Sequence, residues 1–322
     1  MPNVLTHWLH SQEVAKGLVD GTLANAIAKH PRLFNLGSQG PDFLFYYNVY
    51  PWQNQKVNQK IYAIGGQVHK FHVNDFYEAA LLQIKKAEPE SRMAMIAYLA
   101  GHLCHWALDS TVHPFIFYRT NGFTKKTQYW HSRYESMLDT LMVTDVLNKP
   151  LSEYPTQRVL EHDEADIDAV ADLYIPVLQQ VFDTAVDQAT IAYCFKEFHS
   201  VLHWLFSPKT VFFRFMQSLE TVLGIKWKLT SHMVIGKPDH QHDIFNLLHN
   251  EWKNPSKPVI HSSASFLELY QLAINKGIEV LQLLQQALAS GQLQGLLGFI
   301  DNRNYENGLS EFSEMIEFSS VY

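Results

Sequence analysis

The amino-acid sequence predicts an all-α fold. Apolar residues recur at spacings of three and four along most of the 322 residues, and the alternation typical of strands is much rarer. Long stretches consist of Ala, Leu, Gln, Glu and Lys, residues that favour helices. Hydrophobic residues make up 47% of the chain and charged residues 18%, so the helices have enough apolar surface to form a large core.

The expected helices follow this periodicity in chain order. Thr6 or Ser11 is suited to cap the first helix, and Ser91 is suited to cap the third. Pro114 is expected to end the third helix just after His113, because the residue before a proline is biased away from the helical region. The predicted ranges are 11–29, 67–87, 91–113, 127–147, 164–190, 191–206, 208–223 and 264–289.

Two apolar segments need separate interpretation. Residues 30–60 combine prolines and glycines with a cluster of aromatic residues, which predicts an irregular segment of the kind that often lines a site. Residues 211–216 (VFFRFM) favour a core helix, with a lipid interface as the alternative, because they are apolar enough for either.

The chain is expected to form a single helical domain over 1–322. Polar, proline-bearing stretches at 148–168 and 236–265 are the candidate seams, but neither has the low complexity of a linker. We find no internal repeat. Residues 1–147 are therefore interpreted as the part that holds the site, and 148–322 as additional packed helices.

Composition excludes several classes of protein. A formal net charge of −7 gives no electrostatic footprint for duplex nucleic acid. Cys104 and Cys194 are too few for a disulfide framework. No stretch reaches the roughly 20 apolar residues of a transmembrane helix. The first ten residues lack a basic leader, so a cytoplasmic location is expected.

Histidine is concentrated in the first 135 residues, and residues 101–114 (GHLCHWALDSTVHP) carry the densest group. On a helix, His105 and Asp109 lie one turn apart, and His102 and His113 fall close to the same face. The residues between them are mostly apolar, so this face is expected to be buried. Burying so many ionisable groups costs several kcal/mol without a partner. A divalent metal ion is the simplest partner.

A second pair, His131 and Glu135, repeats the same one-turn spacing. Imidazole and carboxylate groups in this combination suit zinc. A lone histidine on an apolar face is more often part of the core, but two such pairs with further histidines favour a metal site. His102 is the weakest candidate, either a ligand or a supporting core residue.

In the order of these residues the chain resembles the bacterial zinc-dependent phospholipases C, whose helical fold is shared with single-strand-specific zinc nucleases. The resemblance covers about residues 1–140. It implies a multi-helix phospholipase C-like fold with additional C-terminal helices, and two or three zinc ions. The implied ligands are Asp42, His69, His105 and Asp109 for one ion, His113, His131 and Glu135 for a second, and His7 with a bridging Asp109 for a third.

The chain departs from this family in three features. The secreted relatives begin with a tryptophan that chelates the third metal, whereas Trp8 is internal here. Three residues separate Asp109 from His113, where relatives have five. Residues 266–288 have a helical pattern, unlike the lipid-binding β-sandwich of the toxin members.

The resemblance and the metal chemistry together predict phosphoester hydrolysis, in which metal-activated water attacks a phosphodiester. The resemblance implies that Asp42 orients or deprotonates this water as well as binding metal. Phe43, Tyr46, Tyr47 and Trp52 are candidates for the wall of a substrate cleft, with ordinary aromatic packing as the alternative. The expected partner is a phosphoester substrate, with phospholipid among the candidates.

Two alternatives remain. The adjacent pairs His162–Asp163 and His242–Asp243 allow an HD-type metal-dependent phosphohydrolase, although the first pair also suits the capped start of a helix. A protein that keeps the zinc scaffold without turnover is the other alternative. Retention of Asp42 favours the enzyme.

Overall fold

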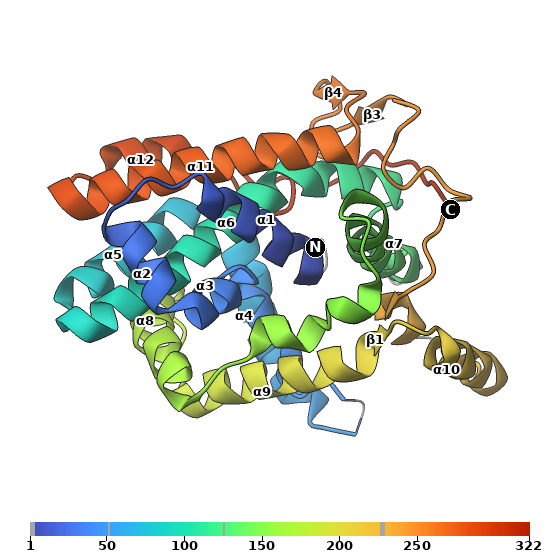
Figure 1. The fold of residues 1–322 in the computed structure, drawn as a ribbon, viewed down its shortest axis with the longest axis horizontal. Coiled ribbons are helices and arrows are strands. Elements are labelled where there is room, and N and C mark those ends of the chain that lie inside the picture. Colours follow the sequence, from blue (N-terminus) through green and yellow to red (C-terminus); the bar gives the residue numbers. More distant parts are fainter. Residues whose placement is uncertain (1–3, 51, 125, 226–228) are drawn as a thin grey trace.

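The computed structural model describes residues 4–50, 52–124, 126–225 and 229–322, and its architecture is all-α as predicted (Figure 1). The long helices are α1 (Val4–Lys16), α2 (Thr22–Lys29), α3 (Pro31–Gly37), α4 (Gln55–Lys70), α5 (Val73–Lys86), α6 (Pro89–Arg119), α7 (Gln128–Leu141), α8 (Glu164–Phe182), α9 (Gln188–Leu205), α10 (Val211–Leu223), α11 (Phe266–Ser290) and α12 (Gln294–Ile300). Shorter helical turns are η1 (Gly40–Tyr46), η2 (Met142–Val146), η3 (Leu151–Glu153), η4 (Thr156–Leu160) and η5 (Leu229–His232).

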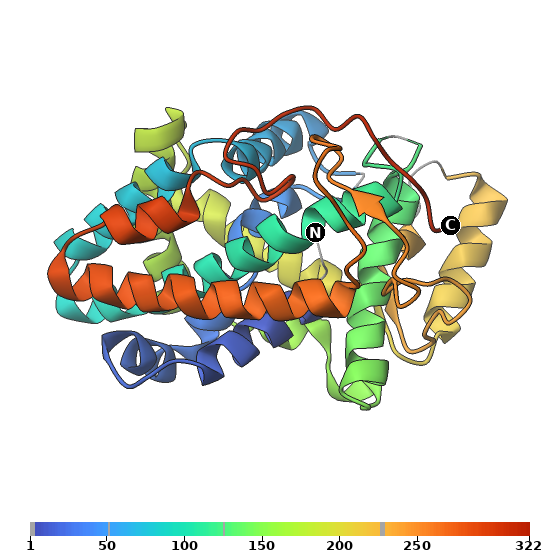
Figure 2. The same cartoon turned by 90° about the horizontal axis from the view of Figure 1, so that it is seen from above.

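Helix α6 is the central element of the molecule. Every residue from Ala94 to Ser110 is buried, because α3, α2, α1 and α11 pack around this helix. Figure 2 shows α11 running along the molecule beside α6, with α12 folded back over it. A histidine on the middle of α6 is therefore surrounded by other elements on all sides.

Two glycines bring α3 unusually close to α6. A Cβ atom on Gly37 would lie 2.1 Å from the carbonyl oxygen of Tyr98, and one on Gly101 would lie 2.2 Å from that of Phe34. Both separations are shorter than any real contact, so this crossing requires glycine on both helices. The crossing places η1, which follows α3, directly beside the middle of α6.

The largest core cluster draws residues from both halves of the chain, from Val4 to Tyr305. Helices beyond residue 147 thus pack against the same core as those before it. The few strands are two residues long: β1 (Phe206–Ser207) pairs in parallel with β2 (Val234–Ile235), and β3 (Trp252–Lys253) pairs antiparallel with β4 (His261–Ser262). Cys104 and Cys194 are both buried and unbonded.

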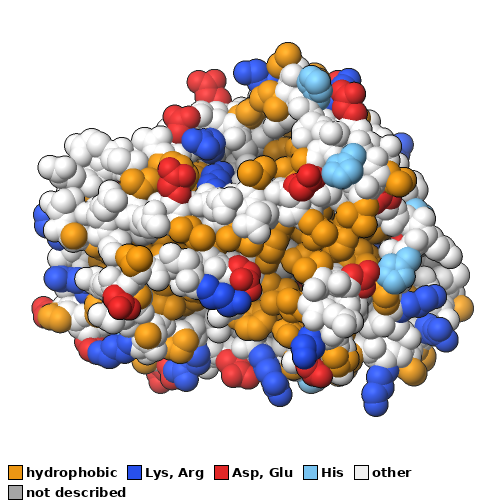
Figure 3. Space-filling view, turned by 45° about the horizontal axis from the view of Figure 1, so that its top comes forward, with side chains coloured by type: hydrophobic (Ala, Val, Ile, Leu, Met, Phe, Trp, Pro, Cys, Tyr) orange, Lys and Arg blue, Asp and Glu red, His pale blue; other side chains and the backbone are white. Residues whose placement is uncertain are grey.

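Part of the apolar surface is exposed. The face in Figure 3 shows hydrophobic side chains gathered around a hollow near its centre, with charged side chains around it. Helix α10 also exposes apolar residues, so the prediction that 211–216 lie in the core is wrong. Among the described residues, no helix has both the length and the apolar character needed to cross a bilayer.

Several helix boundaries differ from the prediction. The range 11–29 contains the end of α1 and all of α2, the range 67–87 contains the end of α4 and all of α5, and the range 164–190 breaks after Phe182. Pro114 does not end its helix, because α6 continues to Arg119. Because proline has no N–H, Pro114 cannot donate a hydrogen bond to the carbonyl of Ser110. That carbonyl faces Gly308 of the C-terminal segment. The packing around α6 outweighs the lost hydrogen bond.

Candidate metal centre

Helix α6 presents His105, Asp109 and His113 at successive turns of one face. Steps of four residues rotate by only about 40°, so the three side chains project in similar directions. All three are buried. Nε2 of His105 lies 2.9 Å from Oδ2 of Asp109, and Nε2 of His113 lies 3.4 Å from Oδ1. The Asp109 carboxylate is thus held between two imidazoles of its own helix.

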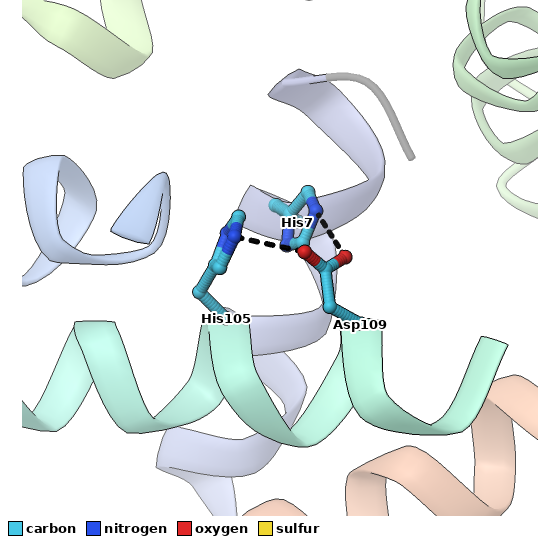
Figure 4. A group of neighbouring side chains, drawn as sticks. All are labelled: His7, His105 and Asp109. Atoms are coloured by element: carbon cyan, nitrogen blue, oxygen red, sulfur yellow. Dashed lines mark ion pairs between the residues drawn. The ribbon is translucent and has the colours of Figure 1, made fainter. Parts of the chain in front are cut away.

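A third imidazole reaches Asp109 from α1. Nε2 of His7 lies 3.1 Å from Oδ1 of Asp109, and the His7 ring stacks on His105 with centroids 4.1 Å apart. Figure 4 shows His7 pointing from α1 toward the two residues of α6. One ligand atom from each of the three residues lies within 4.8 Å of the other two, which makes the group a candidate metal site.

A second group shares His105 with the first. Asp42 lies on η1, and His69 lies near the end of α4. Oδ1 of Asp42 is 3.1 Å from Nε2 of His69 and 3.8 Å from Nε2 of His105. The ligand atoms of these three buried residues also lie within 4.8 Å of one another. Asp109 and Asp42 therefore approach the same imidazole, His105.

Helix α7 brings His131 and Glu135 together, with Nε2 3.1 Å from Oε1. Within the part of the chain that the structure describes, His113 does not join this pair in a group of three whose ligand atoms lie within 4.8 Å. His113 instead contacts Asp109. The assignment of these three residues to one ion stays a prediction.

Four imidazoles are oriented by hydrogen bonds at the nitrogen that faces away from the carboxylates. Nδ1 of His69 lies 2.7 Å from the carbonyl oxygen of Gly65, Nδ1 of His105 lies 3.1 Å from that of Ser38, Nδ1 of His113 lies 2.6 Å from that of Tyr305, and Nδ1 of His131 lies 2.8 Å from Oγ1 of Thr120. A carbonyl oxygen only accepts, so Nδ1 carries the proton in the first three rings. In the neutral tautomer, Nε2 then offers a lone pair to the site.

Each lone pair on Nε2 faces a carboxylate oxygen, which also offers only lone pairs when ionised. This arrangement needs a proton or a cation between the nitrogen and the oxygen. Burial lowers the pKa of His7, His113 and His131 below the usual value, which disfavours the proton at neutral pH. A metal cation satisfies all of these contacts at once.

The donor set fits zinc. Several site atoms are buried and have no hydrogen-bond partner among the residues that the structure describes, namely both ring nitrogens of His7, Nε2 of His105, Nε2 of His113 and both carboxylate oxygens of Asp109. Zinc bonds of about 2.0–2.2 Å in a tetrahedron separate ligand atoms by roughly 3.3 Å, and the observed separations run from 2.9 Å to 3.8 Å. The residues therefore have the chemistry and the spacing of zinc ligands.

The electrostatics of Asp109 and His105 differ from those of the other ligands. Burial would raise the pKa of Asp109, but His113, His105 and His7 outweigh it and hold that pKa well below 3.8. Burial would lower the pKa of His105, but the charges of Asp109 and Asp42 raise it above 6.5. The three imidazoles thus favour the ionised form of Asp109, the carboxylate that they share.

Comparison with known families decides the classification. The family model described as zinc dependent phospholipase C matches residues 6–198, more than half of the chain. The chain belongs to this family. No curated protein and no solved structure matches it. In this zinc-dependent phospholipase C family member, the matched residues include both candidate ligand groups, which run from His7 to Asp109, and the separate pair of His131 and Glu135.

Gly40 allows the close approach of η1 to α6. Its φ is +52°, and a Cβ atom there would lie 2.3 Å from Cδ2 of His105. Any larger residue would meet both backbone strain and the imidazole ring. The glycine two residues before Asp42 thus lets the carboxylate reach His105.

Three supporting residues of this family member escaped the sequence analysis. Thr120 contacts His131, the carbonyl of Tyr305 contacts His113, and Asp139 of α7 binds the first turn of α1. Asp139 accepts hydrogen bonds from the backbone of Leu5 (2.9 Å) and of Thr6 (2.8 Å). Only Asp139 carries a sequence signal, an acidic residue one turn after Glu135 on an apolar helix. Thr120 lies at the end of α6, outside the helix of His131, and Tyr305 is 192 residues from His113.

His102 is a core residue. Its Nδ1 lies 2.9 Å from the hydroxyl of Tyr77, and its Nε2 lies 2.8 Å from the hydroxyl of Tyr174. Both ring nitrogens are therefore occupied by tyrosine hydroxyls. The contacts of His102 therefore fit the supporting role that the sequence allowed, and not the role of a metal ligand.

The aromatic residues near Asp42 pack against helices rather than lining an open cleft. Phe43 is fully buried and stacks on Phe195, with centroids 4.5 Å apart. Tyr46 stacks on Phe198 at 3.8 Å. Trp52 is 80% exposed. The alternative of ordinary packing therefore describes Phe43 better than the expected cleft wall.

The two adjacent His–Asp pairs lie outside the ligand groups. Asp163 caps α8 and pairs with Arg32, while Nδ1 of His162 binds the carbonyl of Leu160. His242 pairs with Asp239 at 2.8 Å in a partly exposed turn. Each pair has a local structural partner, so neither supports an HD-type centre.

Proposed function

We propose that the protein is a zinc-dependent phosphoester hydrolase with phospholipase C-like chemistry. The observation that carries this proposal is the set of buried imidazoles of His7, His105 and His113 around the buried carboxylate of Asp109. Membership of the zinc-dependent phospholipase C family supports the same chemistry. The substrate is a phosphodiester, with phospholipid as the preferred candidate.

We assign two or three zinc ions to the residues named by the resemblance. Asp42, His69, His105 and Asp109 hold the first ion, and His113, His131 and Glu135 hold the second. His7 and Asp109 hold the third. The two compact groups around His105 support the first and third assignments. The His131–Glu135 pair supports the second.

When bound, zinc ions lower the pKa of a coordinated water toward neutrality and neutralise negative charge on phosphoryl oxygens. The protein's own contribution is positioning. Hydrogen bonds at Nδ1 hold the imidazoles of His69, His105 and His113 in fixed tautomers. Asp42 lies at the edge of the group, 5% exposed, and serves as the carboxylate that orients the attacking water and accepts its proton.

The test is metal analysis followed by hydrolysis of bis-p-nitrophenyl phosphate and p-nitrophenylphosphorylcholine, with and without a chelator. We expect metal-dependent turnover. Asp42→Asn should keep most of the metal and lower kcat by about 10²-fold or more, because general-base catalysis has this magnitude. Asp163→Asn, which keeps a good helix cap and lies outside the ligand groups, is the matched control.

Two results would contradict the proposal. Full activity of Asp42→Asn with intact metal content would remove the role of Asp42. A metal-replete wild type that is inert toward monoesters, diesters and phospholipids would identify the alternative, a metal-binding protein without turnover.

A further inference from the structure

Helix α10 stands out at the edge of the molecule (Figures 1 and 2). Most of its exposed residues are apolar. Six apolar residues fall within an arc of about 120° on this helix. Their exposed fractions are Val211 72%, Phe212 37%, Phe215 62%, Leu219 37%, Val222 83% and Leu223 60%. We call these six residues the α10 face. A solvent-exposed helix normally shows the opposite orientation.

The orientation of α10 is fixed by specific contacts on its opposite side. Glu220 is buried and accepts hydrogen bonds from the backbone N–H (3.0 Å) and the hydroxyl (2.6 Å) of Thr230. The guanidinium of Arg133 lies over the ring of Phe213, 5.2 Å from its centroid. These contacts use a buried carboxylate to hold the helix with its apolar face outward. Rotation to bury that face would break them.

The residues around the α10 face complement a phospholipid surface. Arg214 and Lys209 are exposed, whereas Glu220, the acidic residue of α10, is buried. This local positive charge contrasts with the net charge of −7 of the whole chain. Trp204 is 57% exposed, and its ring lies 6.4 Å from that of Phe212, which extends the face with an aromatic residue. Apolar and aromatic residues flanked by cations are typical of helices that lie in a bilayer interface.

The α10 face borders a groove that it shares with the start of α7, the helix that carries His131 and Glu135. This groove of about 420 Å³ separates α10 from the start of α7, and Tyr129, Thr221 and Val222 are among its lining residues. Arg133 of α7 contacts Phe213 of α10, and it lies about 160° around α7 from His131 and Glu135, so these two side chains face away from α10. Contact of α10 with a membrane would therefore bring the start of α7 to the lipid head groups.

We propose that α10, together with Trp204, docks on the surface of a phospholipid bilayer and so brings the protein to its substrate. The link to the substrate rests on the proposed phospholipase function, but membrane docking itself does not require turnover. Docking buries the α10 face among acyl chains, while Arg214 and Lys209 contact phosphate groups.

The experiment measures co-sedimentation of the full chain with phosphatidylcholine vesicles and with vesicles that also contain phosphatidylserine. The metal-loaded protein is used, and release of the phosphorylated head group is followed in parallel so that partitioning is measured before hydrolysis is appreciable. The double variant Phe215→Glu/Val222→Glu should lower vesicle partitioning by about tenfold or more, because it places two charges in the buried face. Leu248→Glu/Val259→Glu alters two residues of similar exposure (75% and 74%) outside α10 and should bind like wild type.

Hydrolysis of soluble p-nitrophenylphosphorylcholine separates this proposal from the proposed function. The α10 variant should keep wild-type activity on the soluble substrate and lose activity on vesicles. Vesicle binding by a wild type that is inert on every phosphoester would leave docking standing and overturn the phospholipase function. Absence of vesicle binding by wild type, or equal binding by the α10 variant, would overturn docking. A wild-type dimer that the α10 variant converts to monomer, without vesicle binding, would show that a second copy covers the face.

Discussion

The hydroxyl of Thr120 donates a hydrogen bond to the carbonyl of Ile116, 2.8 Å away. Toward Nδ1 of His131 the same hydroxyl can therefore only accept a hydrogen bond. His131 must therefore carry its proton on Nδ1, which leaves Nε2 as the ligand atom. We expect Thr120→Val to lower zinc affinity by about 10- to 100-fold, the usual effect of losing such a supporting bond. Competition with a chromophoric chelator measures this affinity.

Thr111→Val is the matched control for this prediction. Thr111 makes the same kind of bond along α6, from its hydroxyl to the carbonyl of Ala107 at 2.8 Å. Both variants lose a hydroxyl bonded to the preceding turn, but only Thr120 contacts an imidazole of the site. Equal zinc affinity in the two variants would show that Thr120 does not orient His131.

Asp139 is a second residue whose environment gives a testable effect. Burial raises its pKa to about 7, even though Leu5 and Thr6 donate hydrogen bonds to the carboxylate. The folded state therefore binds a proton at Asp139 that the unfolded state has released above pH 3.8. This contribution to stability is fully present below pH 3.8 and is lost as the pH rises to about 7.

Asp139→Asn removes this titration. We expect the free energy of unfolding of wild type, relative to that of the variant, to fall by about 3 kcal/mol between pH 4 and pH 7, which is most of the roughly 4 kcal/mol that a difference of about three pKa units corresponds to. Urea denaturation of the metal-free proteins at a series of pH values measures the difference. A difference that stays constant over this range would contradict the raised pKa.

At the scale of elements, the crossing of α3 and α6 positions both Asp42 and His105. Gly101→Ala would place a methyl group 2.2 Å from the carbonyl oxygen of Phe34 and force the helices apart. We expect a loss of about 1–3 kcal/mol in stability and a lower Tm, the usual effect of overpacking. Thermal unfolding followed by circular dichroism measures it.

Gly66→Ala is the control for the crossing. Gly66 lies within α4, and a Cβ atom there would have no neighbour within 4 Å. We expect this substitution to stabilise the protein by about 0.5–1 kcal/mol, because alanine favours the helix. If Gly101→Ala, like Gly66→Ala, did not lower the stability of the protein, α3 and α6 would be able to separate without cost.

The sequence predicted helices better than their ends. Periodicity located α6, α7 and α11 within a few residues on at least one side, because their apolar faces are long. The prediction that Pro114 ends its helix was wrong because the effect of a proline depends on packing. Helix α6 is enclosed by other helices, and Gly308 covers the carbonyl that the proline leaves unbonded. The prediction that residues 211–216 lie in the core was wrong because the apolar pattern of α10 is that of a core helix. The contacts of Glu220 and Phe213 hold the apolar face of α10 outward.

At the scale of the whole molecule, the candidate site joins segments far apart in the chain. The spacing of His105, Asp109 and His113 placed three residues together from helical geometry alone. Asp42, His69 and His7 came from the resemblance, because no local pattern links η1, α4 and α1. Tyr305 acts through its backbone, which no side-chain pattern reports: its carbonyl accepts from His113, and its N–H donates to the carbonyl of His69 at 3.0 Å.

Because α1, η1, α4 and α6 all contribute ligand candidates, metal binding should stabilise the whole fold rather than one loop. An ion bound only by the folded state adds about 4 kcal/mol to the free energy of unfolding when free zinc is about 1,000 times its Kd. We expect a chelator to lower the Tm of wild type and zinc to restore it. In Asp109→Asn, which removes the anionic centre shared by three imidazoles, the zinc-dependent rise in Tm should largely disappear. Equal Tm values of wild type with zinc and with chelator would mean that these buried imidazoles and carboxylates do not share an ion.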